Sequence, residues 1–322
     1  MSVRPSLPDR ARTPLPEFAP ELSIVIPCFN EIENVRGIVA AVTREAVVHA
    51  ASHEIILIDN CSTDGTREAI AEICRGDARV RAIFNNRNYG QMRSPTHGIY
   101  QARGAAVIGM CADFQDPPAM IGALVAMWRG GAKVVLAQRR SERAGVMLTL
   151  ARRLGYAVLA RVADHPIVPG ATGFGLFDRA VVDALKQWRE PEPFFRGMVI
   201  ESGFPIAVLP FDRPPRAAGE TKNGIASLAS FALSGLAGSA KSLLRLPIVL
   251  SLWGFAAALP APTNPPTSAS STGLWLALVL AMFATLLMFL GLIGDQVRLI
   301  GERTRGVPLV IEETRLNFPD AA

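Results

Sequence analysis

The stretch from Leu22 to Glu31, LSIVIPCFNE, is an apolar run that ends abruptly in polar residues. A second such run, EIILID, covers residues 54–59, and shorter ones cover 80–84, 106–111 and 133–137. The segments between them, 33–48, 66–74, 94–103 and 119–129, have the apolar spacing of helices. Short buried strands that alternate with helices predict an α/β fold with a mostly parallel sheet, whose ligands bind at the carboxyl ends of the strands.

Polar clusters follow three of these strands directly. They are CFNE at 28–31, DNCSTDGT at 59–66 and ADFQD at 112–116. Asp, Asn, Ser and Gly are ordinary turn residues, so any one cluster is equally well explained as a turn. Three clusters at the strand ends of one sheet favour a site for chemistry.

The composition points to a membrane-associated protein with one catalytic domain and an appendage. Of the 322 residues 50% are hydrophobic, and the mean hydropathy is +0.27. The net charge of +5 suits anionic lipids or phosphorylated substrates. Because the sequence has no zinc-finger spacing, RNA-binding motif or long Lys/Arg run, no nucleic-acid partner is expected. The four scattered cysteines predict neither a disulfide framework nor a zinc site, so a reducing compartment is expected.

The chain divides into four predicted regions. Residues 1–20 read as a flexible tail, 21–236 as the catalytic domain, 237–300 as a transmembrane hairpin with spans at about 243–261 and 273–294, and 301–322 as a cytoplasmic C-terminal tail. Lys and Arg flank the hairpin on both outer sides, and its linker is uncharged. The positive-inside rule then places both ends, and the catalytic domain, in the cytoplasm. A buried helical hairpin within a soluble fold is the alternative.

Five motifs resemble those of family 2 glycosyltransferases in order and spacing. They are LSIVIPCFNE (22–31), DNCSTDGT (59–66), NYGQ (88–91), DFQDPP (113–118) and RAAGETK (216–222). Within that family they are most similar to the polyprenyl-phosphate glycosyltransferases, relatives of dolichol-phosphate mannosyltransferase. The resemblance implies a nucleotide-sugar-binding, Rossmann-like domain of GT-A type with a C-terminal two-helix transmembrane hairpin. It also implies inverting transfer of a sugar from a nucleotide-sugar, more consistent with a UDP-linked than a GDP-linked donor, to a polyprenyl phosphate.

The expected donor-binding residues lie in or close to the first four motifs. Phe29 offers an aromatic wall for a nucleobase, Asp59 accepts hydrogen bonds, and Asn60 can both donate and accept them. Many members of the family have Asp where this chain has Asn60, which leaves the identity of the nucleotide open. The full set of expected donor contacts is Pro27, Phe29, Glu31, Asp59, Asn60, Asn88, Gln91, Arg93 and Asp113.

The DFQD segment is the predicted metal site. A departing diphosphate needs charge stabilisation, and Mg²⁺ or Mn²⁺ prefers oxygen ligands such as those of Asp113 and Gln115. The family usually has a further Asp where this chain has Cys111, a soft thiol that is a poor ligand for such ions. Asp116 could assist, or could instead cap a helix that begins at Pro117. The predicted catalytic residues are Asp113, Gln115, Arg216 and Lys222.

The acceptor phosphate is expected to bind basic residues near the membrane. The candidates are Arg139, Arg213, Arg216 and Lys222, although a solvated basic face would look the same. The segment 170–177 lacks an Asp that relatives commonly have there. A phosphate monoester is already largely dianionic at neutral pH and needs no general base, so this absence favours a lipid-phosphate acceptor over a sugar hydroxyl.

Other readings stay open at this point. The chain could be a catalytically silent, glycosyltransferase-like membrane subunit, or a transferase acting on another lipid-linked or polysaccharide acceptor. A processive synthase is disfavoured because the sequence has no Gln-x-x-Arg-Trp motif. The sugar, the polyprenol and the homo-oligomeric state are not specified by the sequence.

Overall fold

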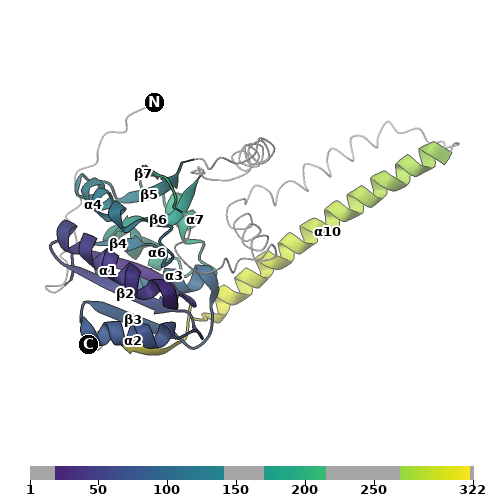
Figure 1. The fold of residues 1–322 in the computed structure, drawn as a ribbon. Helices are drawn as coiled ribbons and strands as arrows, with labels where there is room; N and C mark the ends of the chain where they lie inside the picture. The colour runs from purple at the N-terminus through teal and green to yellow at the C-terminus, as the bar shows by residue number, and fades with distance from the viewer. Residues whose placement is uncertain (1–18, 141–169, 215–268, 320–322) are drawn as a thin grey trace.

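A computed structural model describes residues 19–140, 170–214 and 269–319. Its centre is a mixed sheet of eight described strands in the order β7-β5-β6-β4-β1-β2-β3-β8 (Figure 1). The strands are β1 (Leu22–Cys28), β2 (His53–Asp59), β3 (Val80–Asn85), β4 (Ala106–Gly109), β5 (Val134–Arg139), β6 (Ala171–Asp178), β7 (Ile206–Phe211) and β8 (Glu312–Leu316).

Helices cover both faces of this sheet (Figure 1). One hydrophobic cluster lies between the sheet and α1, α2 and α4, and a second lies between the sheet and α3, α6 and α7. The described helices are α1 (Ile32–His49), α2 (Thr66–Gly76), α3 (Gly90–Gln101), η1 (Pro118–Met120), α4 (Ile121–Arg129), α6 (Arg179–Lys186), α7 (Phe195–Glu201) and α10 (Ala269–Arg305). This three-layer arrangement confirms the predicted Rossmann-like α/β architecture.

The parallel part of the sheet sets the position of the site. β1 pairs in parallel with β2 and with β4, and β2 pairs in parallel with β3. The carboxyl ends of these four strands therefore meet at one edge. α3 packs closely here, because a Cβ on Gly98 would lie 2.7 Å from Cγ1 of Val25 on β1. The strands and helices predicted between residues 22 and 137 are confirmed, with small shifts at their ends.

Regular structure occurs within the region 301–322, for which the sequence predicted a cytoplasmic C-terminal tail. Residues 301–305 complete α10, and Glu312–Leu316 form β8, which pairs antiparallel with β3 and closes that edge of the sheet. An unpaired edge strand exposes backbone hydrogen-bonding groups, which explains why covering β3 is favourable. Part of the region 301–322 that we predicted as a C-terminal tail therefore belongs to α10 and to the sheet of the catalytic domain.

The segment 170–177, which lacks the Asp that the family resemblance led us to expect, is mostly strand β6 and lies inside the sheet. β6 is antiparallel to both β4 and β5, while β5 is parallel to β7. Gly175 lies where the backbones approach closely, since a Cβ there would lie 2.5 Å from the carbonyl oxygen of Val135. Packing between neighbouring strands thus explains this glycine.

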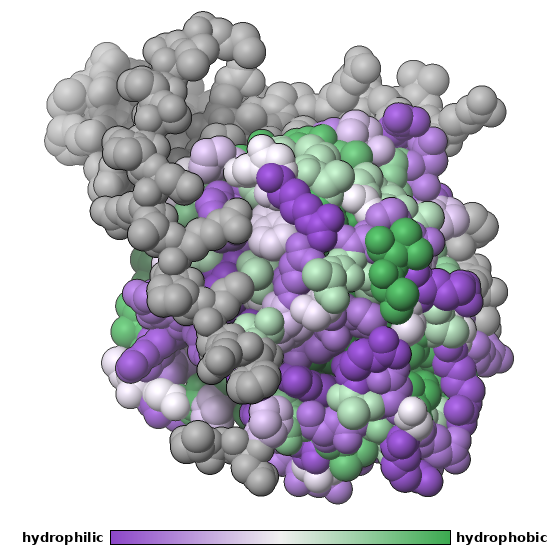
Figure 2. Space-filling view, turned by 90° about the vertical axis from the view of Figure 1, so that its left-hand side faces the viewer, coloured by the Kyte–Doolittle hydropathy of each residue, from purple (hydrophilic) through white to green (hydrophobic). Residues whose placement is uncertain are grey.

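α10 is a 37-residue helix that projects from the domain, with its C-terminal end beside the sheet (Figure 1). Within the described ranges, one helical segment, Val279–Arg305, is long and apolar enough to cross a membrane. Large apolar side chains such as Leu280, Phe283 and Leu287 are more than half exposed along it. The domain surface on the side of α1 and α4, in contrast, is largely hydrophilic with only scattered hydrophobic areas (Figure 2).

The predicted second span, 273–294, falls within α10. The predicted first span, 243–261, and the proposed domain boundary after residue 236 lie outside the described residues. The two-helix hairpin therefore stays a prediction.

Candidate active site at the carboxyl edge of the sheet

Three turns meet at the carboxyl edge, after β1, β2 and β4. Each contains a non-glycine residue with a positive φ, namely Asn30 (54°), Cys61 (65°) and Phe114 (61°). Such backbone conformations are uncommon for these residues and tend to occur at functional sites, where surrounding contacts hold them in place. The three predicted polar clusters are thus the three strained turns of this edge.

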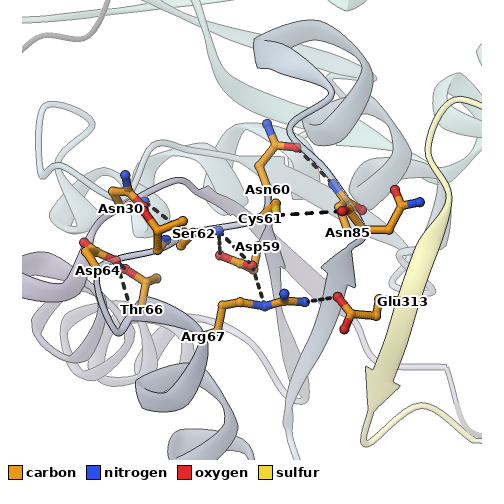
Figure 3. A network of polar contacts seen from close by, with 12 residues as sticks. Asn30, Asp59, Asn60, Cys61, Ser62, Asp64, Thr66, Arg67, Asn85 and Glu313 are labelled. Carbon is orange, nitrogen blue, oxygen red and sulfur yellow. Dashed lines mark hydrogen bonds and ion pairs between the residues drawn. The ribbon is translucent and has the colours of Figure 1, made fainter.

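Hydrogen bonds tie the first two turns together (Figure 3). The backbone N–H of Asn30 donates to the Ser62 hydroxyl at 2.8 Å, and Oδ1 of Asn30 accepts from the backbone N–H of Thr63 at 2.8 Å. The backbone N–H of Glu31 donates to the Thr66 hydroxyl at 2.9 Å. The polar residues of CFNE and DNCSTDGT therefore hold one another, and the backbone around Pro27 to Glu31 has a fixed shape.

Asp59 is fully buried beneath these turns. Its carboxylate accepts from the backbone N–H of Ser62 at 3.2 Å, and Nε of Arg67 lies 3.2 Å from its Oδ2 (Figure 3). Arg67 also pairs with Glu313 of β8 at 2.7 Å. Burial raises the pKa of Asp59, while the bonds from Ser62 and the charge of Arg67 oppose that rise. Asp59 thus supports the site from below, with its carboxylate engaged by other residues of the chain.

Asn60 holds the next loop along the edge. Its Nδ2 donates to Oδ1 of Asn88 at 2.7 Å and to the carbonyl of Gly90 at 3.4 Å. Its Oδ1 accepts from Nδ2 of Asn85 at 3.1 Å and from the backbone N–H of Tyr89 at 2.9 Å. An aspartate has no donor for the first two bonds, which gives a physical reason for Asn at this position.

The DFQD turn brings two carboxylates close to Cys111. Asp113 is 8% exposed and its Oδ1 accepts from the backbone N–H of Gln115 at 3.1 Å. Asp116 is 2% exposed, and its Oδ2 accepts from the backbone N–H of Cys111 at 2.9 Å. Burial raises the pKa of Asp116, while the bond from Cys111 and the charge of Arg213 oppose this. Asp116 does not cap the following helix; it folds back onto the end of β4.

A cavity of about 250 Å³ opens beside this turn. α3 forms one wall and residues 193–196, at the start of α7, form another, while β1, β4 and β6 form the base. Of the predicted site residues, Pro27 and Gln91 line it, together with Cys111 and Asp116. Asp113 and Gln115 lie on the same turn without contributing to the lining of the cavity.

The predicted basic residues are divided in the structure. Arg139 ends β5, and Arg213 follows the end of β7, the strand that pairs in parallel with β5. Arg213 lies close enough to Asp116 for its charge to favour the ionised carboxylate. Arg93 pairs with Glu302 of α10 at 2.7 Å. Arg216 and Lys222 lie outside the described residues.

The sequence did not predict two parts of the site. Asp116, for which the sequence suggests an assisting role or a helix cap, is the carboxylate that lines the cavity. The other part is the wall formed by Phe194, Phe195 and Arg196. The ring centroid of Phe195 lies 5.0 Å from that of Phe177, so this wall packs against the hydrophobic core. The position of Asp116 just after a strand could have indicated its place in the site. No pattern in the sequence indicated that residues 194–196 form a wall of the cavity.

Comparison with known proteins identifies the family. The model of glycosyl transferase family 2 matches residues 23–185, about half of the chain. An uncharacterized glycosyltransferase of Synechocystis sp. is 35% identical over 67% of this chain and 68% of its own length. The chain belongs to glycosyltransferase family 2, as its motifs predicted.

Two other relatives are informative, one by its coverage of the chain and one by its more specific name. YkcC of Bacillus subtilis, an uncharacterized glycosyltransferase, is 28% identical over 90% of this chain and 93% of its own length. The bactoprenol glucosyl transferase of Shigella phage SfV is 29% identical over 70% of this chain and 74% of its own length.

Among solved structures, glucosyl-3-phosphoglycerate synthase from Mycobacterium tuberculosis, in complex with Mn²⁺, UDP and glucosyl-3-phosphoglycerate, is similar at 17% identity. The match covers 68% of this chain and 78% of that chain, with a TM-score of 0.46.

Proposed function

We propose that this chain transfers a sugar, with inversion, from a nucleotide-sugar to a polyprenyl phosphate at the cytoplasmic face of a membrane. The observation that carries the proposal is a sugar-sized cavity beside a turn with two carboxylates, in a domain from which an exposed apolar helix projects. The relatives named bactoprenol glucosyl transferases support a polyprenyl phosphate acceptor.

The carboxyl edge supplies the donor site in this proposal. The loops fixed by Asn30 and Asn60 bind the nucleotide, and the cavity, which is smaller than a typical pocket for a whole drug-sized ligand, takes the sugar. A UDP-linked donor is the one that we propose to test first. Phe29, Glu31, Asn88 and Gln91 remain the proposed contacts to the donor, with Asp59 acting through the turn that it holds.

We propose that the DFQD turn binds a divalent cation with few protein ligands. No group of three His, Cys, Asp or Glu side chains able to hold a metal occurs in the described part of the chain. Asp113 and Gln115 would hold Mg²⁺ or Mn²⁺ together with phosphate and water oxygens, a common arrangement for Mg²⁺. A bound ion would supply positive charge to stabilise the departing diphosphate.

The acceptor phosphate needs cations, and the chain supplies them at the ends of β5 and β7. Arg139 and Arg213, with Arg216 and Lys222 outside the described residues, are the proposed hosts. A phosphate oxygen attacks the anomeric carbon from the side opposite the diphosphate. The bond from that carbon to the diphosphate oxygen breaks, and the diphosphate leaves with the electron pair. No proton has to move, because the phosphate is already ionised.

The position of β8 supports a membrane hairpin. β7 precedes the membrane region and β8 follows it, and both belong to one sheet. If α10 crosses the bilayer, the hairpin predicted from the sequence accounts for both strands lying on the same side. The helix is about 55 Å long at 1.5 Å per residue, so its charged last turns extend beyond a hydrocarbon core of about 30 Å.

The direct test is transfer by the purified full-length protein in lipid nanodiscs that contain polyprenyl phosphate. Radiolabelled UDP- and GDP-sugars are supplied with Mg²⁺ or Mn²⁺, and label is measured in the organic extract. We expect label from one UDP-sugar to enter the lipid, and Asp113→Ala to abolish transfer. Asp183→Ala, an exposed aspartate of α6, is the matched control and should retain activity. Full activity of Asp113→Ala, or no transfer from any donor, contradicts the proposal.

A further inference from the structure

The C-terminal end of α10 makes ion pairs with both walls of the cavity. On one side, Nη2 of Arg93, in α3, lies 2.7 Å from Oε2 of Glu302. On the other, Nη1 and Nη2 of Arg298 lie 2.9 and 3.1 Å from the two oxygens of Glu192. Glu302 and Arg298 are themselves paired at 2.8 Å. Arg93, Glu302, Arg298 and Glu192 therefore form one continuous chain of charges across α10.

A further pair lies one turn along the helix. Arg303 pairs with Glu190, just ahead of the wall residues 193–196. A separate pair joins Arg298 to Asp295 within α10 at 2.9 Å. The segment 190–192 is thus attached to α10 at two points, and α3 at one.

Both attached segments are parts of the cavity. Gln91 and Met92 of α3 directly precede Arg93 and line one wall, while Pro193 and Phe194 directly follow Glu192 and line the other. Ion pairs near the surface add little to global stability, so these five pairs are poorly explained as a device for stability alone. The bidentate pair of Arg298 with Glu192, and the network that these residues share, can instead fix the orientation of the segments that they join.

We propose that the end of α10 holds the two walls of the cavity at a fixed separation, and that Arg298 and Glu302 are positioning residues for the transfer reaction. The kinetic part of this inference rests on the proposed function. We call the ion-paired residues Arg93, Glu302, Arg298, Glu192, Arg303 and Glu190 the brace. Arg93 then belongs to the brace and is not a contact to the donor. The same contacts would couple any displacement of α10 in the bilayer to the shape of the cavity.

The first test compares Glu302→Gln with the wild type in the full-length protein. The amide has the same shape but loses its charge toward both Arg93 and Arg298. We expect hydrogen–deuterium exchange to rise in residues 89–96 and 190–196, with thermal unfolding nearly unchanged. Unchanged exchange in both segments overturns the proposal. This measurement needs no activity, so it stands even if no sugar transfer is found.

The second test is a charge swap. Arg303→Glu should raise the KM for the nucleotide-sugar about threefold to tenfold, with a smaller change in kcat, because a misplaced wall weakens binding first. The double variant Arg303→Glu with Glu190→Arg should return the KM to within about twofold of the wild type, since the pair is restored with reversed sign.

The matched control is Arg305→Glu, which changes the net charge equally at the same helix end. Arg305 makes no ion pair with any residue that the structure describes. It should leave the KM and the exchange of both segments unchanged. Equal effects of Arg303→Glu and Arg305→Glu, or a double variant no better than Arg303→Glu, would show a general charge effect at the membrane and overturn the brace.

Discussion

Arg67 places its Nε 3.2 Å from Oδ2 of Asp59, a carboxylate with no solvent exposure at the end of β2. The guanidinium also lies over the ring of Phe84, 5.2 Å from its centroid, and reaches Glu313 of β8. One arginine thus compensates the buried charge beneath the candidate donor site and joins that site to the C-terminal strand.

Removal of this arginine should destabilise the domain through Asp59. An uncompensated buried carboxylate costs about 3–5 kcal/mol, so Arg67→Met should lower the unfolding temperature in detergent strongly. The double variant Asp59→Asn with Arg67→Met should recover most of the loss, because no charge is then left buried.

The pH dependence has a definite sign. Burial already raises the pKa of Asp59, and the loss of Arg67 should raise it further. When folding raises the pKa of a carboxyl group, the fold loses stability as the pH rises from the unfolded-state pKa to the folded-state pKa. The loss of stability in Arg67→Met should therefore be larger at pH 8 than at pH 5. Glu313→Gln, which removes only an exposed partner, should cost under about 1 kcal/mol. A defect of Arg67→Met that the double variant does not repair would contradict this account.

Asn60→Asp should loosen the loop that follows β3. The new carboxylate cannot donate to Asn88 and Gly90, and it faces the oxygen atoms of both. We expect a loss of about 1–3 kcal/mol of stability and faster hydrogen exchange in residues 86–91. Asn88→Asp, which leaves both bonds donated by Asn60 in place, is the comparison and should have the smaller effect. Equal exchange in Asn60→Asp and the wild type would show that the amide is not needed to hold this loop.

The sequence predicted the elements between residues 22 and 137 well because their signal is local. LSIVIPC and HEIILID are completely or almost completely buried strands, and an uninterrupted apolar run is what such strands require. The three polar clusters were located for the same reason, since each directly follows its strand. Local pattern therefore found the edge of the sheet at which the site lies.

The rest of the site depends on contacts between distant residues. β8, EETRL, contains one apolar residue and no alternation of polar and apolar positions, and only its pairing with β3 makes it a strand. The position of Arg93 close to NYGQ predicts a contact with the donor. In the structure Arg93 pairs instead with Glu302, which lies more than 200 residues away in the sequence. Such pairings leave no local periodicity, so the brace and the closing strand could not be predicted.

Glu312 should make stability fall in acid. Burial disfavours its charge, but hydrogen bonds from His97 and Arg315 outweigh this and lower its pKa from 4.5 to about 2. A lowered carboxyl pKa gives stability that is present above pH 4.5 and is lost as pH falls toward 2. Glu312→Gln should therefore cost about 2 kcal/mol at pH 7. The difference from the wild type, measured by thermal unfolding, should shrink steadily as pH falls from 4.5 toward 2. A difference that is constant with pH would contradict this role of Glu312.

Cys111→Asp tests whether the DFQD turn holds a metal. Desolvation of the thiol and the nearby carboxylates of Asp116 and Asp113 raise the pKa of Cys111, although part of the residue is exposed to solvent. The wild-type residue is therefore a neutral, soft group beside hard oxygen atoms. A carboxylate there adds a hard ligand, and we expect Mn²⁺ affinity in the presence of UDP to rise about tenfold in isothermal titration.

The same charge should cost stability when no ion is present. Three carboxylates within one turn repel one another, so Cys111→Asp should unfold at a lower temperature than the wild type in chelator and at a similar or higher temperature in Mn²⁺. Cys111→Ser, of similar size and neutral, controls for the loss of sulfur and should show neither effect. If Cys111→Asp and Cys111→Ser bind Mn²⁺ equally, the cation does not bind at this turn, and the role assigned to Asp113 must move elsewhere.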